Sequence, residues 1–352
     1  MQERSEYIDI AKGLGMFLVI WGHIKHGGIT PSFVYSFHMP LFFFISGMLF
    51  NCSGNKSFLP FIKKRARRLL VPYICYSIVT WLLWVGYNTF AHKDIANIFN
   101  PLLQTFIAQG STGYLVHNTP LWFITCLFMV EVMFFFIIKL GHRGAIALSF
   151  VTAMTSMFLV GKIAWFSELP WNIEVALVAV FFYACGSMVR ENLSLNALYQ
   201  MVSSHKGISL ITVLTLGGAI ILLSGIYDGA DMGADYFTQN HLIFLIMGTM
   251  GSIMTVVLAA LICCLTRNRF TKTVRRFIDW FGQQSMDVLS IHVPIKGIIV
   301  VFLAKAFSIP LQDSYFFGWK ESVMAFILTT ACTAFMVYLI SFMKKKFNYN
   351  VR

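Results

Sequence analysis

The chain is divided into about ten apolar segments, each close to the ~20 residues that a helix needs to cross a lipid bilayer. Hydrophobic residues make up 57% of the 352 residues and charged residues only 12%, which excludes an ordinary water-soluble domain. Lipid offers the backbone no hydrogen-bond partners, so such segments must be helical. The sequence therefore predicts an all-α polytopic membrane protein. The segments are 8–24, 34–50, 69–90, 121–140, 144–160, 173–190, 208–226, 242–265, 286–305 and 322–343.

Lysine and arginine are distributed unevenly between the loops, and the side that holds most of them is expected to be cytoplasmic. That side holds Lys63, Lys64, Arg65, Arg67, Arg68, Lys139, Arg143, Arg190, Lys206, Arg267, Arg269, Lys272, Arg275, Arg276, Lys344, Lys345 and Lys346. The opposite loops hold scattered lysines, such as Lys25, Lys93 and Lys162. Both termini are therefore predicted to be cytoplasmic. The net charge of +12 is mainly this topology signal, and its spread over many loops argues against a nucleic-acid partner.

We expect residues 1–352 to form a single integral-membrane domain. No cleavable signal peptide, appended soluble domain or internal repeat is recognisable in the sequence. Most of the seven cysteines lie inside predicted spans and lack metal-ligand spacing. The cysteines therefore predict neither a disulfide framework nor a metal site, and buried apolar packing is their expected role.

The stretch from Tyr7 to Phe50 retains ionisable groups where lipid normally excludes them. Lys12 and His23 are eleven residues apart, which is close to three helical turns and about 16 Å, so they share a helix face. Asp9, one turn before Lys12, lies near that face. His38 opens the next apolar segment. This stretch is the strongest candidate for a functional site.

Two motifs in this stretch resemble those of the acyltransferase family 3 integral-membrane proteins, with the fucose O-acetyltransferase-like branch the nearest in appearance. The first is a basic residue, ten residues and a histidine, from Lys12 to His23, and the second is Phe37-His38-Met39-Pro40-Leu41-Phe42-Phe43-Phe44-Ile45-Ser46-Gly47. Weaker matches follow at Leu121-Trp122-Phe123, Leu169-Pro170-Trp171, Ser285-Met286-Asp287 and Ile291-His292-Val293-Pro294. Many relatives have arginine at the position of Lys12, and lysine offers a point charge instead of a planar fork.

The resemblance implies a membrane O-acyltransferase in a bacterial inner or plasma membrane. Its donor would be cytoplasmic acyl-coenzyme A, usually acetyl-coenzyme A, and its acceptor a hydroxyl of a sugar or of an envelope or exported glycan. Lys12, with Arg67 and Arg68 in the next basic loop, would bind the donor phosphates. The same basic loop is equally typical of a topology anchor on anionic lipid.

His23 suits the general base, because the ordinary pKa of histidine lies near neutrality. His38 has three possible roles: to orient His23, to donate to the oxyanion or to bind the acceptor. Asp9 completes the catalytic set on this face. No Gly-x-Ser-x-Gly elbow is present, which favours direct transfer without a covalent serine. The alternative for both histidines is simple capping of helix ends.

Polar residues of the later spans form a second group of candidates. Trp122 is typical of an interfacial belt, with stacking on a sugar ring as the alternative. Glu131 lies in mid-span, where it is either neutral or paired with Lys296. Asn172 and Glu174 begin the sixth span, where they either cap the helix or bind acceptor hydroxyls.

Asp287, His292 and Lys296 lie on the ninth span and are expected to face the bundle interior, with His292 assigned to substrate binding. Residues 227–241 are acidic but lack calcium-loop spacing, so a solvated loop is expected there.

A proton-coupled transporter or polysaccharide exporter is the alternative function, because intramembrane acids, lysines and histidines also serve carriers. Inverted repeats or paired broken helices would favour it, and neither is evident in the sequence.

Overall fold

The structure is a computed structural model that describes residues 5–24, 29–50, 57–90, 97–110, 114–227, 230–237, 240–265, 268–309 and 318–346. Lys25, Lys93 and Arg267 of the topology argument lie outside these ranges. The described residues are helical apart from turns, loops and one isolated bridge between Asp231 and Tyr236. The α-helices are α1 (Glu6–His23), α2 (Ile29–Tyr35), α3 (His38–Met48), α4 (Phe58–Phe90), α5 (Asn100–Ile107), α6 (Trp122–Ile137), α7 (Gly141–Leu159), α8 (Ile173–Asn192), α9 (Leu195–Ser204), α10 (Lys206–Ile226), α11 (His241–Leu265), α12 (Arg269–Gln283), α13 (Ser285–Ala306) and α14 (Trp319–Lys346).

Seven helical segments in the described chain are long and apolar enough to cross a membrane, which confirms the all-α membrane class. One of them, Thr119–Leu159, contains both α6 and α7. The two helices are separated within it by a turn at Gly141, where φ is 74°. The other candidates are α4, α8 with the short turn before it, α10, α11, α13 and α14. All ten predicted spans fall on helical segments, whereas their number as spans and the cytoplasmic termini stay predictions.

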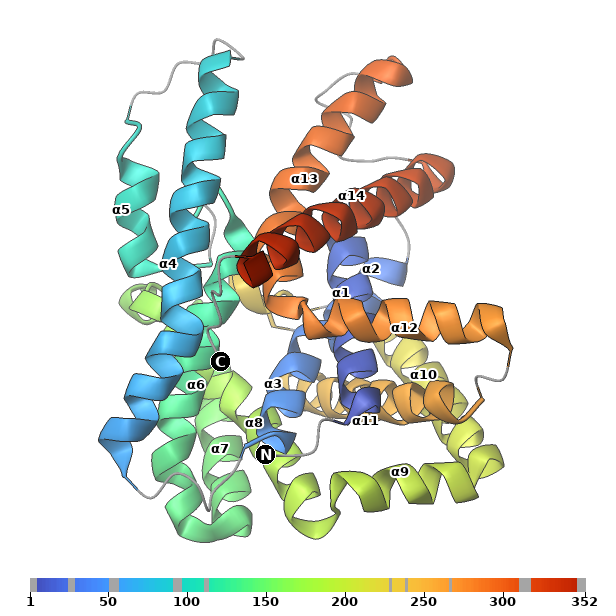
Figure 1. Cartoon of the computed structure of the whole chain (residues 1–352). Helices are drawn as coiled ribbons and strands as arrows, with labels where there is room; N and C mark the ends of the chain where they lie inside the picture. Colours follow the sequence, from blue (N-terminus) through green and yellow to red (C-terminus); the bar gives the residue numbers. More distant parts are fainter. Residues whose placement is uncertain are drawn as a thin grey trace.

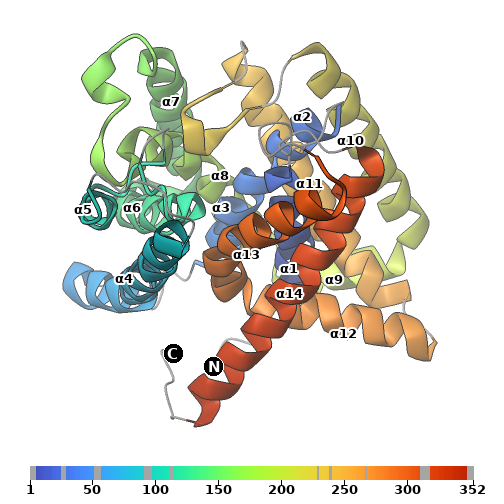
Figure 2. The same cartoon turned by 90° about the horizontal axis from the view of Figure 1, so that it is seen from above.

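Helices α1 and α3 carry the two N-terminal motifs and lie at the centre of the bundle (Figures 1 and 2). Helix α3 is apolar on all sides and almost wholly buried, as expected for a helix surrounded by others. It packs mainly on α8, while α1 packs mainly on α12 and α11. The two helices are close in the sequence, but the helices that surround them, α8, α11 and α12, come from much later in the chain.

Glycines allow the closest helix crossings. The α-carbon of Gly47 lies against the backbone of Tyr183, and Gly186 lies against the backbone of Phe44, so α3 and α8 touch main chain to main chain. At the α1–α12 crossing, Gly282 lies against the carbonyl of Asp9. Small residues are the usual means of close helix approach in membranes, where hydrophobicity does not distinguish a helix from lipid.

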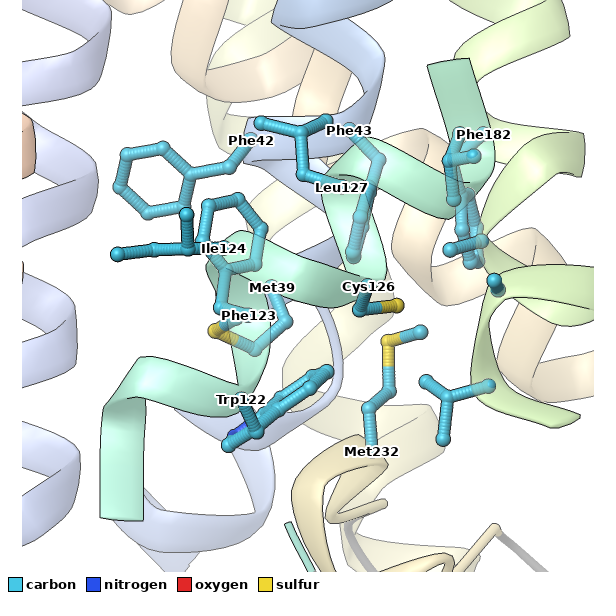
Figure 3. Packing of buried hydrophobic residues seen from close by; sticks show 14 of the residues in the cluster. Met39, Phe42, Phe43, Trp122, Phe123, Ile124, Cys126, Leu127, Phe182 and Met232 are labelled. Carbon is cyan, nitrogen blue, oxygen red and sulfur yellow. The ribbon is translucent and has the colours of Figure 1, made fainter. Parts of the chain in front are cut away.

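Aromatic side chains fill the space between α3, α6 and α8 (Figure 3). Phe43 contacts Phe123 at 5.0 Å between ring centroids, and Trp122 contacts Phe123 edge-on at 6.2 Å. These rings pack beside Met39 and Leu127, as Figure 3 shows. The core thus fixes α3, and with it His38, relative to α6.

Candidate active site

A cavity of about 1460 Å³ lies between α1, α3, α4, α6, α13 and α14. It follows α4 from Lys64 to Leu83, which corresponds to about 28 Å of helix at 1.5 Å per residue. Much of its wall is apolar, including Met39, Phe123 and Leu289. A cavity of this shape suits a long molecule with an apolar part.

Basic side chains from three separate parts of the sequence line this cavity: Lys12, Lys64, Arg65, Arg68, Lys344 and Lys345. Three of them are paired with carboxylates at N–O distances of 3.1 Å for Lys12 and Asp9, 3.1 Å for Arg65 and Glu131, and 2.7 Å for Lys344 and Asp287. Within the described chain, the other three form no ion pair. The cavity therefore carries surplus positive charge and favours an anionic ligand.

The structure corrects the partner of Glu131 and distinguishes two arginines of the basic loop. Glu131 pairs with Arg65, and its predicted partner Lys296 instead donates a hydrogen bond of 3.4 Å to the backbone carbonyl of His23. Arg68 lines the cavity as predicted, whereas Arg67 is exposed and is not among the lining residues. Positions three apart share a helix face, so Arg65 and Arg68 point the same way. This spacing could have indicated from the sequence that Arg65 lines the cavity together with Arg68.

Asp287 is the centre of a contact that sequence reasoning missed. Lys344 bonds both of its oxygens, at 2.7 and 2.9 Å, and the Tyr76 hydroxyl donates to one of them at 2.7 Å. Asp287 is buried and faces the bundle interior, as predicted. The contact joins α4, α13 and α14, and neither partner could be chosen from spacing in the sequence.

The predicted catalytic histidines come together in space. The rings of His23 and His292 lie 5.1 Å apart between centroids, and His38 lies 4.9 Å from the ring of Tyr35. The Tyr35 hydroxyl in turn donates to the carbonyl of Gly22, next to His23. His292 and His38 are also among the groups whose charge acts on His23. The structure thus clusters three histidines from α1, α3 and α13.

Hydrogen bonds define the tautomers of two of these histidines. Nδ1 of His38 lies 2.9 Å from the carbonyl of Val34, and Nδ1 of His292 lies 2.9 Å from that of Leu289. A carbonyl only accepts, so Nδ1 must carry the proton in both, and Nε2 of each neutral ring is an acceptor. Nε2 of His292 is buried and has no hydrogen-bond partner among the described residues. A buried acceptor of this kind is available to a hydroxyl group.

The cavity and the histidine cluster are neighbours along the same helices. Met39 and Ile291 line the cavity, and each is adjacent in sequence to a histidine of the cluster, His38 or His292. None of the three histidines is itself among the lining residues. Helix α1 spans both regions, with Lys12 at the cavity and His23 three turns further along.

The remaining predicted substrate residues lie in another part of the bundle, and none lines the cavity. Trp122 is buried, with its indole against Gly233, so the interfacial-belt interpretation is wrong. Both groups of the Asn172 amide are used inside the protein, where Oδ1 accepts from the Gly110 amide at 2.8 Å and Nδ2 donates to the Ala108 carbonyl at 2.6 Å. Glu174 is fully buried, and neither of its carboxylate oxygens has a hydrogen-bond partner in the part of the chain that the structure describes.

Residues 230–237, between α10 and α11, pack against the bundle through the buried Ala230, Met232 and Phe237, which contradicts the solvated loop expected there. Asp231 accepts from the Gly233 amide at 3.0 Å, and Oδ1 of Asp235 is buried without a hydrogen-bond partner among the described residues. Burial, with the charge of Asp231 added, raises the pKa of Asp235 to about 7. The charge of Asp235 also acts on Glu174.

The structure is thus a helical membrane bundle with a basic cavity beside a pair of buried histidines, His38 and His292. The chain belongs to the acyltransferase 3 family: residues 5–344 match its acyltransferase domain, and the protein is an acyltransferase.

Two curated relatives are similar over part of the chain. An O-acetyl transferase of Shigella phage Sf6 is 24% identical over 239 residues, which are 58% of this chain and 72% of the phage protein. The nodulation protein NolL of Mesorhizobium japonicum is 39% identical over 94 residues, 23% of this chain and 25% of NolL. No solved structure is significantly similar to the chain.

Proposed function

We propose that the protein is a membrane O-acyltransferase that moves an acetyl group from cytoplasmic acetyl-coenzyme A to a hydroxyl of a sugar or exported glycan. The observation that carries the proposal is the long cavity with surplus positive charge beside the histidine cluster. The name of the phage relative, an O-acetyl transferase, supports the same reaction. The proposed location is a bacterial inner or plasma membrane, with about ten spans and both termini in the cytoplasm.

The donor phosphates would bind at the basic part of the cavity. Arg68 has no ion-pair partner among the described residues, and Lys12 and Arg65 add positive charge beside it. Phosphate contacts with lysine and arginine are charge-assisted and stronger than neutral hydrogen bonds. The pantetheine arm would follow the apolar wall along α1 toward the histidines.

His23 is proposed as the general base. It takes the proton of the acceptor hydroxyl, the hydroxyl oxygen attacks the thioester carbonyl, and the carbon–sulfur bond breaks to release coenzyme A, whose thiolate takes up the proton. Nε2 of His292, which has no hydrogen-bond partner among the described residues, would accept a hydrogen bond from a second hydroxyl of the acceptor, in line with its predicted role in substrate binding. His38, buried beside Tyr35, orients the site.

Four further predicted residues remain part of the proposed site, two of them, Asp9 and Asn172, in positioning roles. Asp9 holds Lys12 at 3.1 Å and thereby positions its charge at the cavity. Trp122 and Glu174 form the second polar region, where the unpartnered carboxylate of Glu174 would accept hydroxyl groups of a sugar. Asn172 would contribute by holding the 108–110 backbone in place there.

The purified protein, supplied with acetyl-coenzyme A and a panel of sugars and glycans, should release coenzyme A and yield an acetylated product. Arg68→Ala should weaken coenzyme A binding by about tenfold or more, because it removes a charge-assisted contact. Arg67→Ala is the charge-matched control, since Arg67 is exposed away from the cavity, and it should bind as the wild type does. Solute flux into vesicles without coenzyme A release would instead establish the transporter.

A further inference from the structure

The last turn of α14 contains three consecutive lysines that differ in position. Lys344 and Lys345 line the cavity, and Lys346 does not. Basic residues at the end of a span normally anchor it at the lipid surface. That role does not require two of the three to face a cavity between helices.

Lys344 is held in a defined contact. Its ammonium binds both oxygens of Asp287, whose carboxylate is only 7% exposed, and the Tyr76 hydroxyl donates to the same carboxylate. A bidentate contact with a largely buried carboxylate is stronger than an exposed ion pair, because water competes with it less. The Tyr76–Asp287–Lys344 contact therefore fixes the end of α14 against α4 and α13.

Lys345 has no such partner. Among the described residues it forms no ion pair, and neither do Lys64 and Arg68 on α4, which line the same cavity. The carboxylates that line the cavity, Glu131 and Asp287, are already neutralised by Arg65 and Lys344. Helices α4 and α14 thus both contribute unpaired cations to one cavity. This arrangement suits a ligand with several phosphate groups.

We propose that the end of α14 is a phosphate-binding subsite of the donor cavity. Lys345 binds a phosphate of coenzyme A, and the Tyr76–Asp287–Lys344 contact positions it. The inference rests on the proposed donor, and adds to it a second group of phosphate ligands, more than 270 residues away in sequence from the Arg65–Arg68 turn.

Coenzyme A binding by the full-length protein in nanodiscs of phosphatidylcholine alone tests the subsite, because anchoring to anionic lipid is then absent. Lys345→Gln should weaken binding by about tenfold or more, as expected for loss of a charge-assisted contact. Lys346→Gln removes the same charge one residue further on and should remain within about twofold of the wild type. Equal affinities for the two variants would overturn the proposal.

The positioning contact is tested by Asp287→Asn, read by the same binding measurement. This change makes the cavity more positive, so simple electrostatics predicts tighter binding of a phosphate ligand. Our proposal predicts weaker binding, because the end of α14 is no longer held in place. Tighter or unchanged binding in a variant that remains monodisperse would refute the positioning role.

Two failures would be distinguishable. If the wild type itself fails to bind coenzyme A, the proposed function is wrong. If the wild type binds and Arg68→Ala weakens binding while Lys345→Gln does not, only the α14 subsite is wrong.

Discussion

At the scale of single residues, backbone carbonyls fix the tautomers of two histidines in the cluster. The carbonyls of Val34 and Leu289 hold the Nδ1 protons of His38 and His292, so the other nitrogen of each ring is an acceptor. Among the described residues, the ring of His23 forms no hydrogen bond to a carbonyl, and its neighbours are the ring of His292 and the Lys296 side chain. The backbone therefore does not fix the tautomer of His23 as it does those of His38 and His292.

His23→Ala should lower turnover by about 10²–10⁴-fold, the usual contribution of a general base. Coenzyme A binding should be retained, because the proposed phosphate site lies about three turns away along α1. Turnover and calorimetric binding measure the two effects separately. His205→Ala, an exposed histidine outside the cluster, is the control. A rate within a few-fold of the wild type would move the assignment to His38 or His292.

Asp235 should make the protein less stable as the pH rises. The pKa of Asp235 is about 7 in the folded protein against an ordinary value of 3.8, because its carboxyl is buried and lies near Asp231. The unfolded chain releases this proton near pH 4 and the folded chain only near pH 7. Stability is therefore lost between about pH 4 and pH 7, and the loss is complete above that range.

Asp235→Asn cannot ionise, so it should unfold at a higher temperature than the wild type at about pH 8. The difference should disappear below about pH 4, where both side chains are neutral. One pKa unit corresponds to about 1.36 kcal/mol, so the gain amounts to at most a few kcal/mol. Asparagine also tolerates the left-handed backbone at this position, where φ is 54°. Glu168→Gln, at an exposed carboxylate, should show no such pH-dependent gain.

At the scale of helices, the α3–α8 crossing sets the position of His38. Gly47 and Gly186 lie on the two sides of this crossing, each against the backbone of the opposite helix. A methyl group at either position would collide with main chain, which cannot rotate away as a side chain can. Gly47, at the end of the second motif, is thus explained by packing, while the His38 end belongs to the candidate site.

Gly47→Ala and Gly186→Ala should therefore each separate α3 from α8 and destabilise the protein by about 1–3 kcal/mol, the usual cost of overpacking. Gly218→Ala, in the middle of α10, is the matched control, because a methyl group there would meet no atom of a neighbouring helix within the described residues. Alanine favours a helix over glycine, so the control should be neutral or slightly stabilising. Thermal unfolding in detergent measures all three. Equal stability of Gly186→Ala and Gly218→Ala would contradict the close crossing.

At the scale of the whole molecule, the cavity joins regions that are distant in sequence. Lys12, Arg68 and Lys345 belong to the beginning, first third and end of the chain, yet all line one space. From the uneven distribution of basic residues between loops, Arg68 and Lys345 are predicted to lie on the same side of the membrane. Their convergence in the structure agrees with that assignment and supports entry of an anionic donor from that side.

The basic loops predict that both ends of the chain are cytoplasmic. Reporter domains that are active only in the cytoplasm should therefore be active when fused at either terminus, and reporters that are active only outside should be silent. Fusion within the 160–168 connection between α7 and α8 should give the opposite result. A terminal fusion that reports an outside location would reverse the direction of donor entry or change the number of spans.

Much of the fold could be predicted from the sequence, because lipid imposes a simple constraint on every residue within it. Helical segments, their positions and the membrane class follow from length and hydropathy. The association of Lys12 with Asp9 and the common face of Lys12 and His23 follow from helix geometry, which acts within a few turns. The interior position of Asp287 and His292 follows from the cost of exposing them to lipid.

What only the tertiary structure decided is which helices are neighbours, and hence which charges meet. Glu131 could equally have paired with Lys296 by depth alone, but α6 lies beside α4, so its partner is Arg65. Asp287 meets Tyr76 and Lys344, which are 211 and 57 residues away in the chain. Hydropathy is a property of each segment by itself, whereas an ion pair depends on the packing of two segments. The sequence by itself therefore determined the helices and the class of protein, and the packing of the helices determined the cavity and its charges.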